Sequence, residues 1–528
     1  MESDGPASTR VAVIGIGAVG LVTLKNLLEE GYDAFGFDRN DYIGGLWHFT
    51  PEDKTSVLPS TVANVSKERN CFTDFPFPEE TPSLCPASEV EKYLEQYADH
   101  FNLRPRIRLG TLVTRVWRDD AREKWVLNIQ GSTSQVFDKV VFATGTYHKP
   151  NIPAIPAIET YTGVSLHSRA YKDPKPFEGK NVLIVGFGNT GADTAVSLVG
   201  VANKVYISHR EGTLIFPRLR NGCPVDHSLT ARMTAVQGLF QRHFPGIAEA
   251  LLNNFGKKLQ DEAFNIRPEW GLSPAPSLKF GIPVVSDEIV AALEAGTVES
   301  VPGVRAAVAP RAFELQDGRR LDEIDAVIYC TGYCADFGLL EPRFDPTRDT
   351  TPAWAAAPGS RGKPLPRLYR NIFSLDHPYS LVYVGGVFTP LPAFPLFDVT
   401  SMALVQVWRG RSPLPPRDEM IASVDRHHAW MVENAKIAKV TPNLVDRREW
   451  SAWVDEAAGM GIQERLGWGW RGWAFWLSDP KLCSLLMTGL SSPHQYRLFD
   501  CGKRKAWRGA RAEIERVNRA VKEKPKTA

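Results

Sequence analysis

Long apolar runs are absent from this 528-residue chain. A membrane-spanning helix needs about 18 or more consecutive apolar residues, so we expect none here. Charge of one sign is equally scarce, because 62 lysines and arginines balance 60 aspartates and glutamates to a net charge of +2. That balance gives no reason to expect nucleic acid as a partner. The polar N-terminus leads directly into an apolar segment, which does not fit a secretory signal peptide.

Cysteine is sparse as well. The seven cysteines include no metal-ligand spacing and no Cys-x-x-Cys pair, so we expect no metal site, no disulfide framework and a reducing, cytoplasmic location. Cys330 and Cys334 lie nearest to one another, yet Cys330 ends an apolar, strand-like segment. We interpret Cys330 as a small buried residue rather than as half of a redox pair.

Two glycine-rich turns, residues 15–20 and 186–191, dominate what is present. Each follows a short apolar segment and precedes a helical pattern. Glycines let such a turn approach a pyrophosphate, and the helix N-terminus that follows faces the anion. One such turn is weak evidence, because tight strand-to-helix turns are common, but two predict two dinucleotide sites. The expected contacts are Gly15, Gly17, Ala18 and Gly20 in the first turn, and Gly186, Gly188, Asn189, Thr190 and Gly191 in the second.

The residues beyond each turn distinguish the two sites. A strand-like segment after the first turn ends in Asp38, where a carboxylate would bind a ribose 2′-hydroxyl. The corresponding segment after the second turn contains Ser208 and is followed by Arg210, a hydroxyl and a cation suited to a 2′-phosphate. The second site is therefore predicted to take NADP rather than NAD.

A second repeat supports this plan. Residues 137–145 and 324–332 share an acid, a β-branched and aromatic segment, and a terminal Thr-Gly. Each segment follows one glycine turn at a similar distance along the sequence, as expected of a strand that returns to the same sheet beside the ligand. The sequence therefore predicts an α/β fold with two Rossmann-like dinucleotide-binding domains.

With these motifs the chain resembles the flavin-containing monooxygenases. Residues 44–47, 63–68 and 74–78 are similar to segments that line FAD in that family. A further pattern lies between the two turns and resembles a family motif that begins with Phe where this chain has Tyr. Its residues are Tyr161, Gly163, His167 and Tyr171. The resemblance implies FAD contacts at Asp38, Arg39, Gly45, Leu46, Trp47, Asn64, Val113, Thr144 and Gly145, and NADP contacts that include Thr331 and Gly332.

The resemblance also implies a discontinuous FAD domain with the NADP domain inserted in it. The expected segments are 1–178 and 330–528 for FAD and 179–329 for NADP. Prolines near residue 175 and the Thr331-Gly332 pair mark these joints independently. Residues 225–265 carry apolar side chains at spacings of three and four, which predicts a helical insertion. We expect its apolar face to pack against the domain, with a roof over the active site as the alternative.

The chemistry implied by the resemblance uses FAD, NADPH and O₂. A C4a-(hydro)peroxyflavin would pass oxygen to nitrogen or sulfur of a small organic molecule, and the cofactor would carry the difficult step. Asn64 is the catalytic candidate, because its amide donates a hydrogen bond without titrating; the alternative is an Asx turn. For His167 we favour a role in coupling the domains over direct proton transfer.

Three other functions stay open. A Baeyer–Villiger monooxygenase, which converts a ketone to an ester, resembles this family but carries Trp where this chain has Tyr171. A pyridine-nucleotide disulfide oxidoreductase shares the two-dinucleotide plan but requires a cysteine pair beside the flavin. An FAD-binding sensor would bind the flavin without oxidising NADPH.

The remaining segments carry fewer signals. Residues 341–380 and 411–480 show little motif-level match, and substrate choice is expected there and in the insertion, with tailoring of a secondary metabolite as one interpretation. The Trp-rich residues 468–476 are expected in a core or at a pocket mouth, although peripheral contact with a membrane stays open. The sequence does not decide between a monomer and a homo-oligomer.

Overall fold

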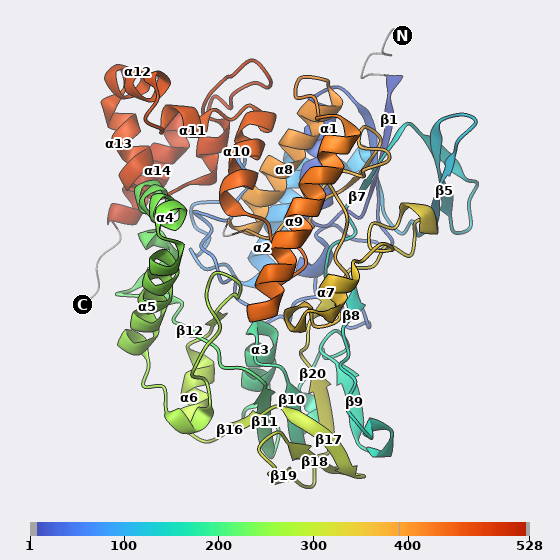
Figure 1. Ribbon diagram of the computed structural model, residues 1–528, viewed down its shortest axis with the longest axis vertical. Coiled ribbons are helices and arrows are strands. Elements are labelled where there is room, and N and C mark those ends of the chain that lie inside the picture. Colours follow the sequence, from blue (N-terminus) through green and yellow to red (C-terminus); the bar gives the residue numbers. More distant parts are fainter. Residues whose placement is uncertain (1–7, 390, 524–528) are drawn as a thin grey trace.

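The computed structural model describes residues 8–389 and 391–523, so the chain ends of both expected FAD segments lie outside it. Two five-stranded parallel sheets form its framework, one in each half of the molecule (Figure 1). The first sheet has the strand order β22-β7-β1-β2-β3 and the second has β16-β11-β10-β20-β9. The first contains β1 (Arg10–Ile14), β2 (Asp33–Phe37), β3 (Ile107–Arg108), β7 (Lys139–Phe142) and β22 (Leu381–Tyr383); the second contains β9 (Val164–His167), β10 (Asn181–Val185), β11 (Lys204–His209), β16 (Val298–Pro302) and β20 (Ala326–Tyr329).

Both sheets lie between helices and a small antiparallel sheet. Successive side chains of a strand point to opposite faces, so Val11 and Val13 of β1 join one core cluster while Ala12 and Ile14 join another. The first cluster includes residues of the helices α1 and α8, and the second includes residues of strands β4, β5 and β6. These elements are α1 (Ala18–Glu29), α8 (Ala393–Trp408), β4 (Val113–Asp119), β5 (Lys124–Ile129) and β6 (Gln135–Phe137).

The second unit repeats this arrangement. In β10, Val182 and Ile184 pack into the cluster that contains α3 and α6, whereas Leu183 packs towards β17 and β18. Because both faces of each parallel sheet are covered, the central strands are continuous apolar runs, as in doubly wound folds. The fold class is therefore the predicted one. The bounds are α3 (Asn189–Leu198), α6 (Glu288–Glu294), β17 (Val304–Ala309), β18 (Ala312–Leu315) and β19 (Arg320–Leu321).

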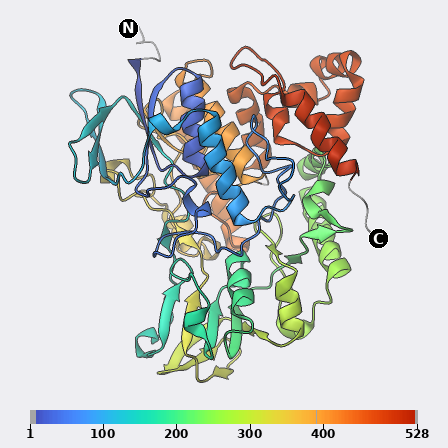
Figure 2. The same ribbon diagram turned by 180° about the vertical axis from the view of Figure 1, so that it is seen from behind.

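The second unit starts earlier in the chain than the expected boundary between residues 178 and 179. Strand β9 precedes that boundary and pairs in parallel with β20, with His167 opposite Tyr329. The chain passes between the units at two adjacent places, since β8 (Lys149–Pro150) and β21 (Tyr333–Cys334) form an antiparallel pair. Figure 2 shows from behind how the second unit extends from one end of the first.

Further helices lie outside these sheets and the layers that cover them. α2 lies early in the first unit, α4 and α5 form the helical insertion, and α7 to α14 belong to the C-terminal part (Figure 1). Their bounds are α2 (Ala87–His100), α4 (Ala231–His243), α5 (Pro245–Ala263), α7 (Pro352–Ala356), α9 (Arg417–Ile437), α10 (Arg447–Ala458), α11 (Ile462–Arg465), α12 (Trp470–Ser478), α13 (Pro480–Thr488) and α14 (Ala510–Glu523). The short strands β12 (Ile215–Phe216) and β15 (Val284–Val285), and β13 (Leu219–Arg220) and β14 (Cys223–Pro224), form two further pairs.

Two expectations about exposure are wrong. The insertion is helical as predicted, but most of its large apolar side chains do not pack against the domain: Leu239, Phe240 and Phe244 are exposed, whereas Ala248 and Leu259 are buried. The Trp-rich segment does not enter a core either, because Trp468 and Trp470 are exposed. Helical spacing predicts which side chains share a face, and it does not predict what covers that face.

None of the helices in the described residues is long and apolar enough to cross a membrane. All seven cysteines lie in this part of the chain and are free thiols.

A buried cluster of charged groups joins the two ends of the chain. The Arg497 guanidinium donates to both carboxylate oxygens of Glu29 at 2.9 and 3.0 Å, and it lies 3.4 Å from Asp74. Lys25 pairs with Asp74 and lies 2.6 Å from Glu29, while Asp398 accepts from the amide of Thr73 at 2.8 Å. Burial alone would raise the pKa of Glu29 and of Asp74, but Arg497 and Lys25 outweigh it, and both values are lowered.

Replacing Arg497 by Met is expected to lower the free energy of unfolding by about 3–5 kcal/mol, because the buried carboxylates of Asp74 and Asp398 lose their partner. Glu29 and Asp74 have lowered folded-state pKa values, so their stabilisation is present above the unfolded-state pKa, about 4, and is lost as pH falls. Urea midpoints measured at neutral and acidic pH should therefore converge between the wild type and Arg497→Met as pH falls.

The control is Arg320→Met, which removes an exposed ion pair with Asp322 and should change the midpoint little. Equal midpoints for Arg497→Met and the wild type at neutral pH would contradict a stabilising role for the cluster.

Candidate functional site

The two glycine turns have the same geometry. Gly15 and Gly186 have φ angles of +95° and +113°, a region that favours glycine. A Cβ at either position would lie 2.5 Å from a carbonyl oxygen, that of Ala143 in the first turn and that of Cys330 in the second. Both carbonyls belong to the strand that returns beside the turn, so the predicted repeat of turn and returning strand is one structural unit used twice.

The middle glycines of the turns indicate where a ligand binds. Gly17 and Gly188 have φ angles of −74° and −101°, which any residue adopts. A Cβ at Gly188 would enter open space, and one at Gly17 would touch only Gly45 at 3.6 Å. Nothing inside the fold therefore requires glycine at these positions, whereas a pyrophosphate close to the backbone would require it. Among the described residues, no side chain caps the N-terminus of α1 or α3, which leaves amide N–H groups for an anion.

Asp38 is held at the end of β2, beside the first turn. Its carboxylate accepts from the amides of Ile16 at 2.7 Å and Asn40 at 2.9 Å. Burial raises its pKa against these bonds. Because a carboxylate has several lone pairs, Asp38 can hold the turn and still accept from a ribose. The neighbouring Arg39 is exposed and lies 3.4 Å from His148.

The other predicted FAD contacts divide into two groups. Gly44 bridges to Gly17, which places the Gly45-Leu46-Trp47 segment against the first turn, and Trp47 stacks edge-on against Phe394. Val113 lies elsewhere: its side chain is buried in the core between β1 and β5, so only its backbone is available to a ligand.

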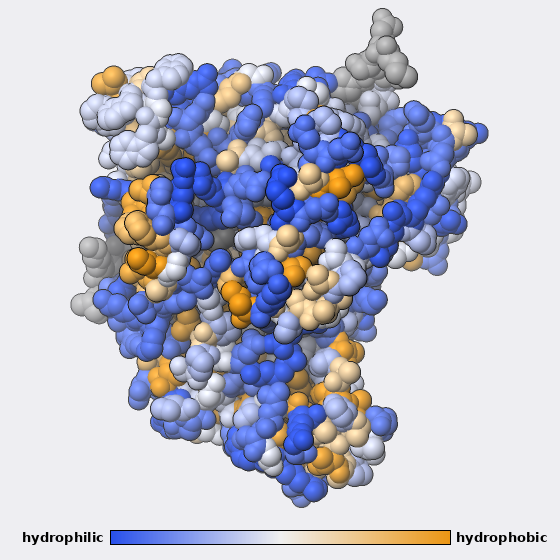
Figure 3. All heavy atoms as spheres, viewed as in Figure 1, coloured by the Kyte–Doolittle hydropathy of each residue, from blue (hydrophilic) through white to orange (hydrophobic). Residues whose placement is uncertain are grey.

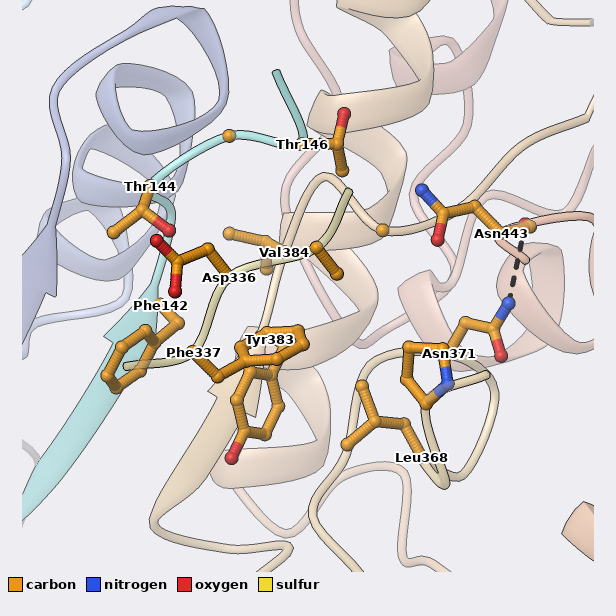
Figure 4. Close-up of a pocket in the computed structure, with 14 residues that line it drawn as sticks. Phe142, Thr144, Thr146, Asp336, Phe337, Leu368, Asn371, Tyr383, Val384 and Asn443 are labelled. Carbon is orange, nitrogen blue, oxygen red and sulfur yellow. Dashed lines mark hydrogen bonds between the residues drawn. The ribbon is translucent and has the colours of Figure 1, made fainter. Parts of the chain in front are cut away.

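Thr144 and Gly145 follow β7 at the carboxyl edge of the first sheet. They line a small cavity of about 50 Å³ together with residues from β22 and the loops around Asn371 and Asn443. Figure 4 shows Thr144 and Asp336 on one side of this cavity, with Asn371 donating to the Asn443 carbonyl on the other. The carboxyl edge where strand order reverses is the usual ligand position in doubly wound sheets.

A larger pocket of about 770 Å³ lies at the carboxyl ends of β11 and β16. Arg210 and His209 line it, as expected for a site that receives the adenosine end of NADP. Ser208 does not, because its hydroxyl is buried and donates to the Pro302 carbonyl at 2.8 Å. The predicted hydroxyl contact is thus replaced by a structural bond within the sheet.

Three further cations near Arg210 have no signal in the sequence. Lys439 lines the same pocket, and burial followed by repulsion from Lys363, Arg361 and Arg210 lowers its pKa. Burial, with repulsion from Arg210, also lowers the pKa of Arg361. Lys363 approaches Gly332, where an added Cβ would lie 3.9 Å from its ammonium nitrogen. Arg361 also pairs with Glu211, and the remaining cations of this cluster suit a phosphate.

Asn64 lies in a loop of the first unit and faces the second turn. Its side-chain amide donates to the side-chain oxygen Oδ1 of Asn189 at 3.2 Å. Asn189 is fixed in turn, because that oxygen also accepts from the amide of Val285 at 2.8 Å and its own amide donates to Pro283 at 3.3 Å. The catalytic candidate and a predicted NADP contact are therefore in direct contact.

The motif residues between the turns hold β9 in place. His167 accepts from the amide of Arg169 at Nδ1, so its Nε2 carries the proton and donates to the Gly332 carbonyl at 3.0 Å. Burial lowers its pKa, which favours this neutral form. A Cβ at Gly163 would collide with the Tyr161 ring, and the Tyr171 hydroxyl lies 2.7 Å from Ser197.

Contacts between the units surround this region. Arg169 forms a two-pronged ion pair with Asp53 at 2.8 and 2.9 Å, and Thr331 donates to the Asn151 carbonyl at 2.5 Å. On the other side of Asn64, Asp226 of the insertion accepts from both the amide and the hydroxyl of Ser66. The loop that carries Asn64 and Ser66 thus contacts both the second turn and the insertion.

Two dinucleotide cradles joined through the contact between Asn64 and Asn189 define an oxidoreductase that passes electrons between two bound cofactors. Comparison with known proteins gives the family: the chain belongs to the flavin-binding monooxygenase-like family, whose model matches residues 8–526. It is an FAD-dependent monooxygenase with NADPH as the second cofactor. The resemblance inferred from the motifs is confirmed.

The relatives agree with this assignment. The chain is 45% identical to monooxygenase aurF of Gibberella zeae, over 96% of this chain and 97% of that protein. The S-allyl-L-cysteine S-oxygenase of Allium sativum is a structural neighbour with a TM-score of 0.61 and 23% identity, covering 85% of this chain and 88% of that one. NADP⁺-bound cyclohexanone monooxygenase of Rhodococcus sp. Phi1 has a TM-score of 0.60 and 18% identity, covering 86% and 98%. These two structures show a common fold.

Arg210→Ala is expected to raise the KM for NADPH by about tenfold or more, because a charge-assisted contact to phosphate is lost. The KM for NADH, which lacks the 2′-phosphate, should change little. Steady-state kinetics with both nucleotides measure this preference. The matched control is Ser208→Ala, whose hydroxyl faces Pro302 and whose loss should leave the preference unchanged. An unchanged preference in Arg210→Ala would refute the assignment.

Proposed function

We propose that this monooxygenase oxygenates a nitrogen or sulfur atom of a small organic molecule. The observation that carries the proposal is the contact between Asn64 and Asn189, which places an uncharged amide at the junction of the two cradles. Bound FAD, reduced by NADPH, supplies the activation of O₂. The chain then has three tasks: to hold both cofactors, to direct a hydrogen-bond donor at the reacting centre, and to exclude water.

Holding FAD falls to the first turn, the loop at residues 44–47, Asp38 and the Thr144-Gly145 turn. NADPH is held by the second turn, with Arg210, Arg361, Lys363 and Lys439 around its phosphates. Support comes from the middle glycines, whose Cβ positions are open, and from the depressed pKa of Lys439 beside the other cations. The negative charge of a bound 2′-phosphate would offset the repulsion among these cations.

Asn64 suits the donor role because a carboxamide stays neutral at every working pH. The Asn189 oxygen accepts one of its two amide hydrogens and so fixes the plane of the amide. The second hydrogen is available to a bound ligand. A donor that is fixed before reaction costs no reorganisation when charge develops, which is how preorganised groups contribute to catalysis.

Water exclusion is supported by buried contacts near Asn64, which is itself exposed. His227 lies 3.3 Å from Glu68, and both side chains are buried. Burial raises the pKa of Glu68, but bonds from His227 and Ser83 outweigh it and lower the value to about 2. These groups join the insertion to the loop that carries Asn64, and a closed site suppresses the competing release of hydrogen peroxide.

Two alternative chemistries have less support. The Cys330 thiol is buried beside Thr194, and its pKa is raised to about 12, which disfavours the thiolate that a disulfide oxidoreductase needs. Baeyer–Villiger oxidation of a ketone stays the second candidate among the monooxygenases, since the fold is common to both. The Tyr171 side chain is buried against Phe177, so it offers no contact to distinguish the two.

A direct test supplies the FAD-loaded protein with NADPH and O₂ and adds an aryl sulfide, a tertiary amine or a cyclic ketone. We expect the sulfide or the amine to gain one oxygen atom by mass spectrometry, with NADPH consumed in step. Conversion of the ketone alone would establish the Baeyer–Villiger alternative. Absence of NADPH oxidation with all three would overturn the enzymatic proposal in favour of a sensor.

The Asn64–Asn189 contact predicts a change in coupling. Asn189→Ala removes the acceptor that orients Asn64, so the rate of product formation should fall about tenfold, while hydrogen peroxide released per NADPH rises. Asn64→Asp should have a larger effect, since it replaces the donor by a carboxylate. The matched control is Asn203→Ala, which removes an exposed asparagine pair with Asn181 at 2.8 Å. Unchanged coupling in Asn189→Ala would rule out the positioning role.

A further inference from the structure

Two arginines near the loop that carries Asn64 have no carboxylate in an ion pair with them. Arg69 lies on that loop, and its guanidinium donates to the backbone carbonyl of Asp226 at 3.2 Å. Its Nε is buried and has no hydrogen-bond partner among the described residues. The side chain of Arg447, the first residue of α10, forms neither a hydrogen bond nor an ion pair with any described residue. Each guanidinium therefore keeps donors that the fold does not use.

The surroundings of these two arginines differ from those of an ordinary surface cation. Hydrophilic residues cover much of the outer surface (Figure 3), where water solvates a charge. Arg69 and Arg447 are instead partly buried, and burial is the main cause that lowers the pKa of each. A charge that loses water without gaining a partner is costly, so these groups destabilise the fold until something binds them.

The two guanidinium groups also repel each other. Besides burial, repulsion from Arg69 lowers the pKa of Arg447, and Tyr496 lies near both groups. Tyr496 does not offset their charge, because burial raises the pKa of its hydroxyl and keeps that hydroxyl neutral. Asp226 attracts Arg69, although its Oδ2 already accepts from the amide and the hydroxyl of Ser66. Arg447 in particular keeps an uncompensated positive charge.

Both arginines flank the segment that leads from β22 into α8. On one side Asn70, the residue after the first arginine, accepts from the Phe394 amide at 3.0 Å. On the other side Val445, two residues before the second arginine, donates to the Phe388 carbonyl at 3.2 Å. In the same segment the Thr389 hydroxyl is buried without a hydrogen-bond partner in the described part of the chain. Since β22 ends at the carboxyl edge of the first sheet, where doubly wound sheets bind ligands, the two cations lie beside that edge.

The loop also connects these cations to the catalytic candidate. Arg69 follows Asn64 by five residues, and five residues span at most about 18 Å even when fully extended. Ser66, between them, and Arg69 both bind Asp226 of the insertion. A group held by the arginines therefore lies close to the junction of the two cradles, where Asn64 meets Asn189.

We propose that Arg69 and Arg447 bind an anionic oxygen substituent, such as a carboxylate, on the molecule that the enzyme oxygenates. A guanidinium binds a carboxylate through two parallel hydrogen bonds, and such charge-assisted bonds are stronger than neutral ones. The same cations would repel a protonated amine. The inference rests on the proposed oxygenation of nitrogen or sulfur and adds the substrate class: an acidic molecule with a sulfur atom or an uncharged nitrogen.

Calorimetric titration of the full-length protein, loaded with FAD and saturated with NADP⁺, tests this inference without turnover. The probes are 4-(methylthio)benzoate and methyl phenyl sulfide, which differ by one carboxylate. We expect the carboxylate to bind about tenfold more tightly or better, because it gains charge-assisted hydrogen bonds. Arg447→Gln should remove this preference, and Arg447→Lys, which keeps the charge, should retain part of it. The matched control is Arg448→Gln, which changes the exposed neighbouring arginine and should leave the preference intact.

The Arg447 side chain forms no bond within the described fold, so its variants should fold, and bound FAD verifies this. Equal binding of the two sulfides to the wild type would overturn the inference. So would an equal loss of affinity for both sulfides in Arg447→Gln together with slower reduction of FAD by NADPH, because the arginine would then act on the flavin. Oxygen transfer to either sulfide is followed separately by mass spectrometry. Preferential binding of the carboxylate without oxygenation of either sulfide would support the anion site and refute the proposed function.

Discussion

Arg497 and the carboxylates around it are the constraint on which the first unit depends. Charges are costly to bury unless they are paired, so the buried Asp74, Asp398 and Arg497 must come together. Glu29, which is more exposed, adds a two-pronged contact to the same guanidinium. Glu29 ends α1, the helix whose N-terminus forms the first cradle. The position of that cradle is therefore set from the far end of its helix by a residue near the C-terminus of the chain.

The second unit has the same architecture as the first. It differs in the contacts that attach it to the rest of the chain. Several of its contacts with the first unit are polar: Arg169 with Asp53, Asp226 with Ser66, and Asn189 with Asn64. Its Phe280 also packs in a core cluster with Trp354 and Met431 of the C-terminal part. Such polar contacts can break and re-form more readily than a buried charge cluster or a shared apolar core. The polar contacts beside the second turn can therefore rearrange while the apolar contact at Phe280 and the first cradle keep their shape.

The sequence predicted what local chemistry determines and missed what the tertiary fold assembles. The glycine turns were predictable because the space around Gly15 and Gly186 permits no other residue. Ser208 was assigned to phosphate because it lies at the right strand end, but the pleat turned its hydroxyl inward. Lys439 was not predictable, since residues distant in sequence reach the pocket only after the units are joined. The exposure of the insertion was missed for a related reason: helical periodicity predicts which side chains share a face, but it does not predict what packs against that face.

The placement of β22 and α8 has a consequence for synthesis on the ribosome. Strand β22 completes the edge of the first sheet beside β7, yet it lies about two hundred and forty residues further along the chain, beyond the whole second unit. A chain that emerges from its N-terminus can therefore complete the inserted unit first, while β7 waits with an unpaired edge. A ribosome-bound intermediate would have a finished outer lobe attached to an open, edge-exposed sheet, and chaperones would meet the protein in that state.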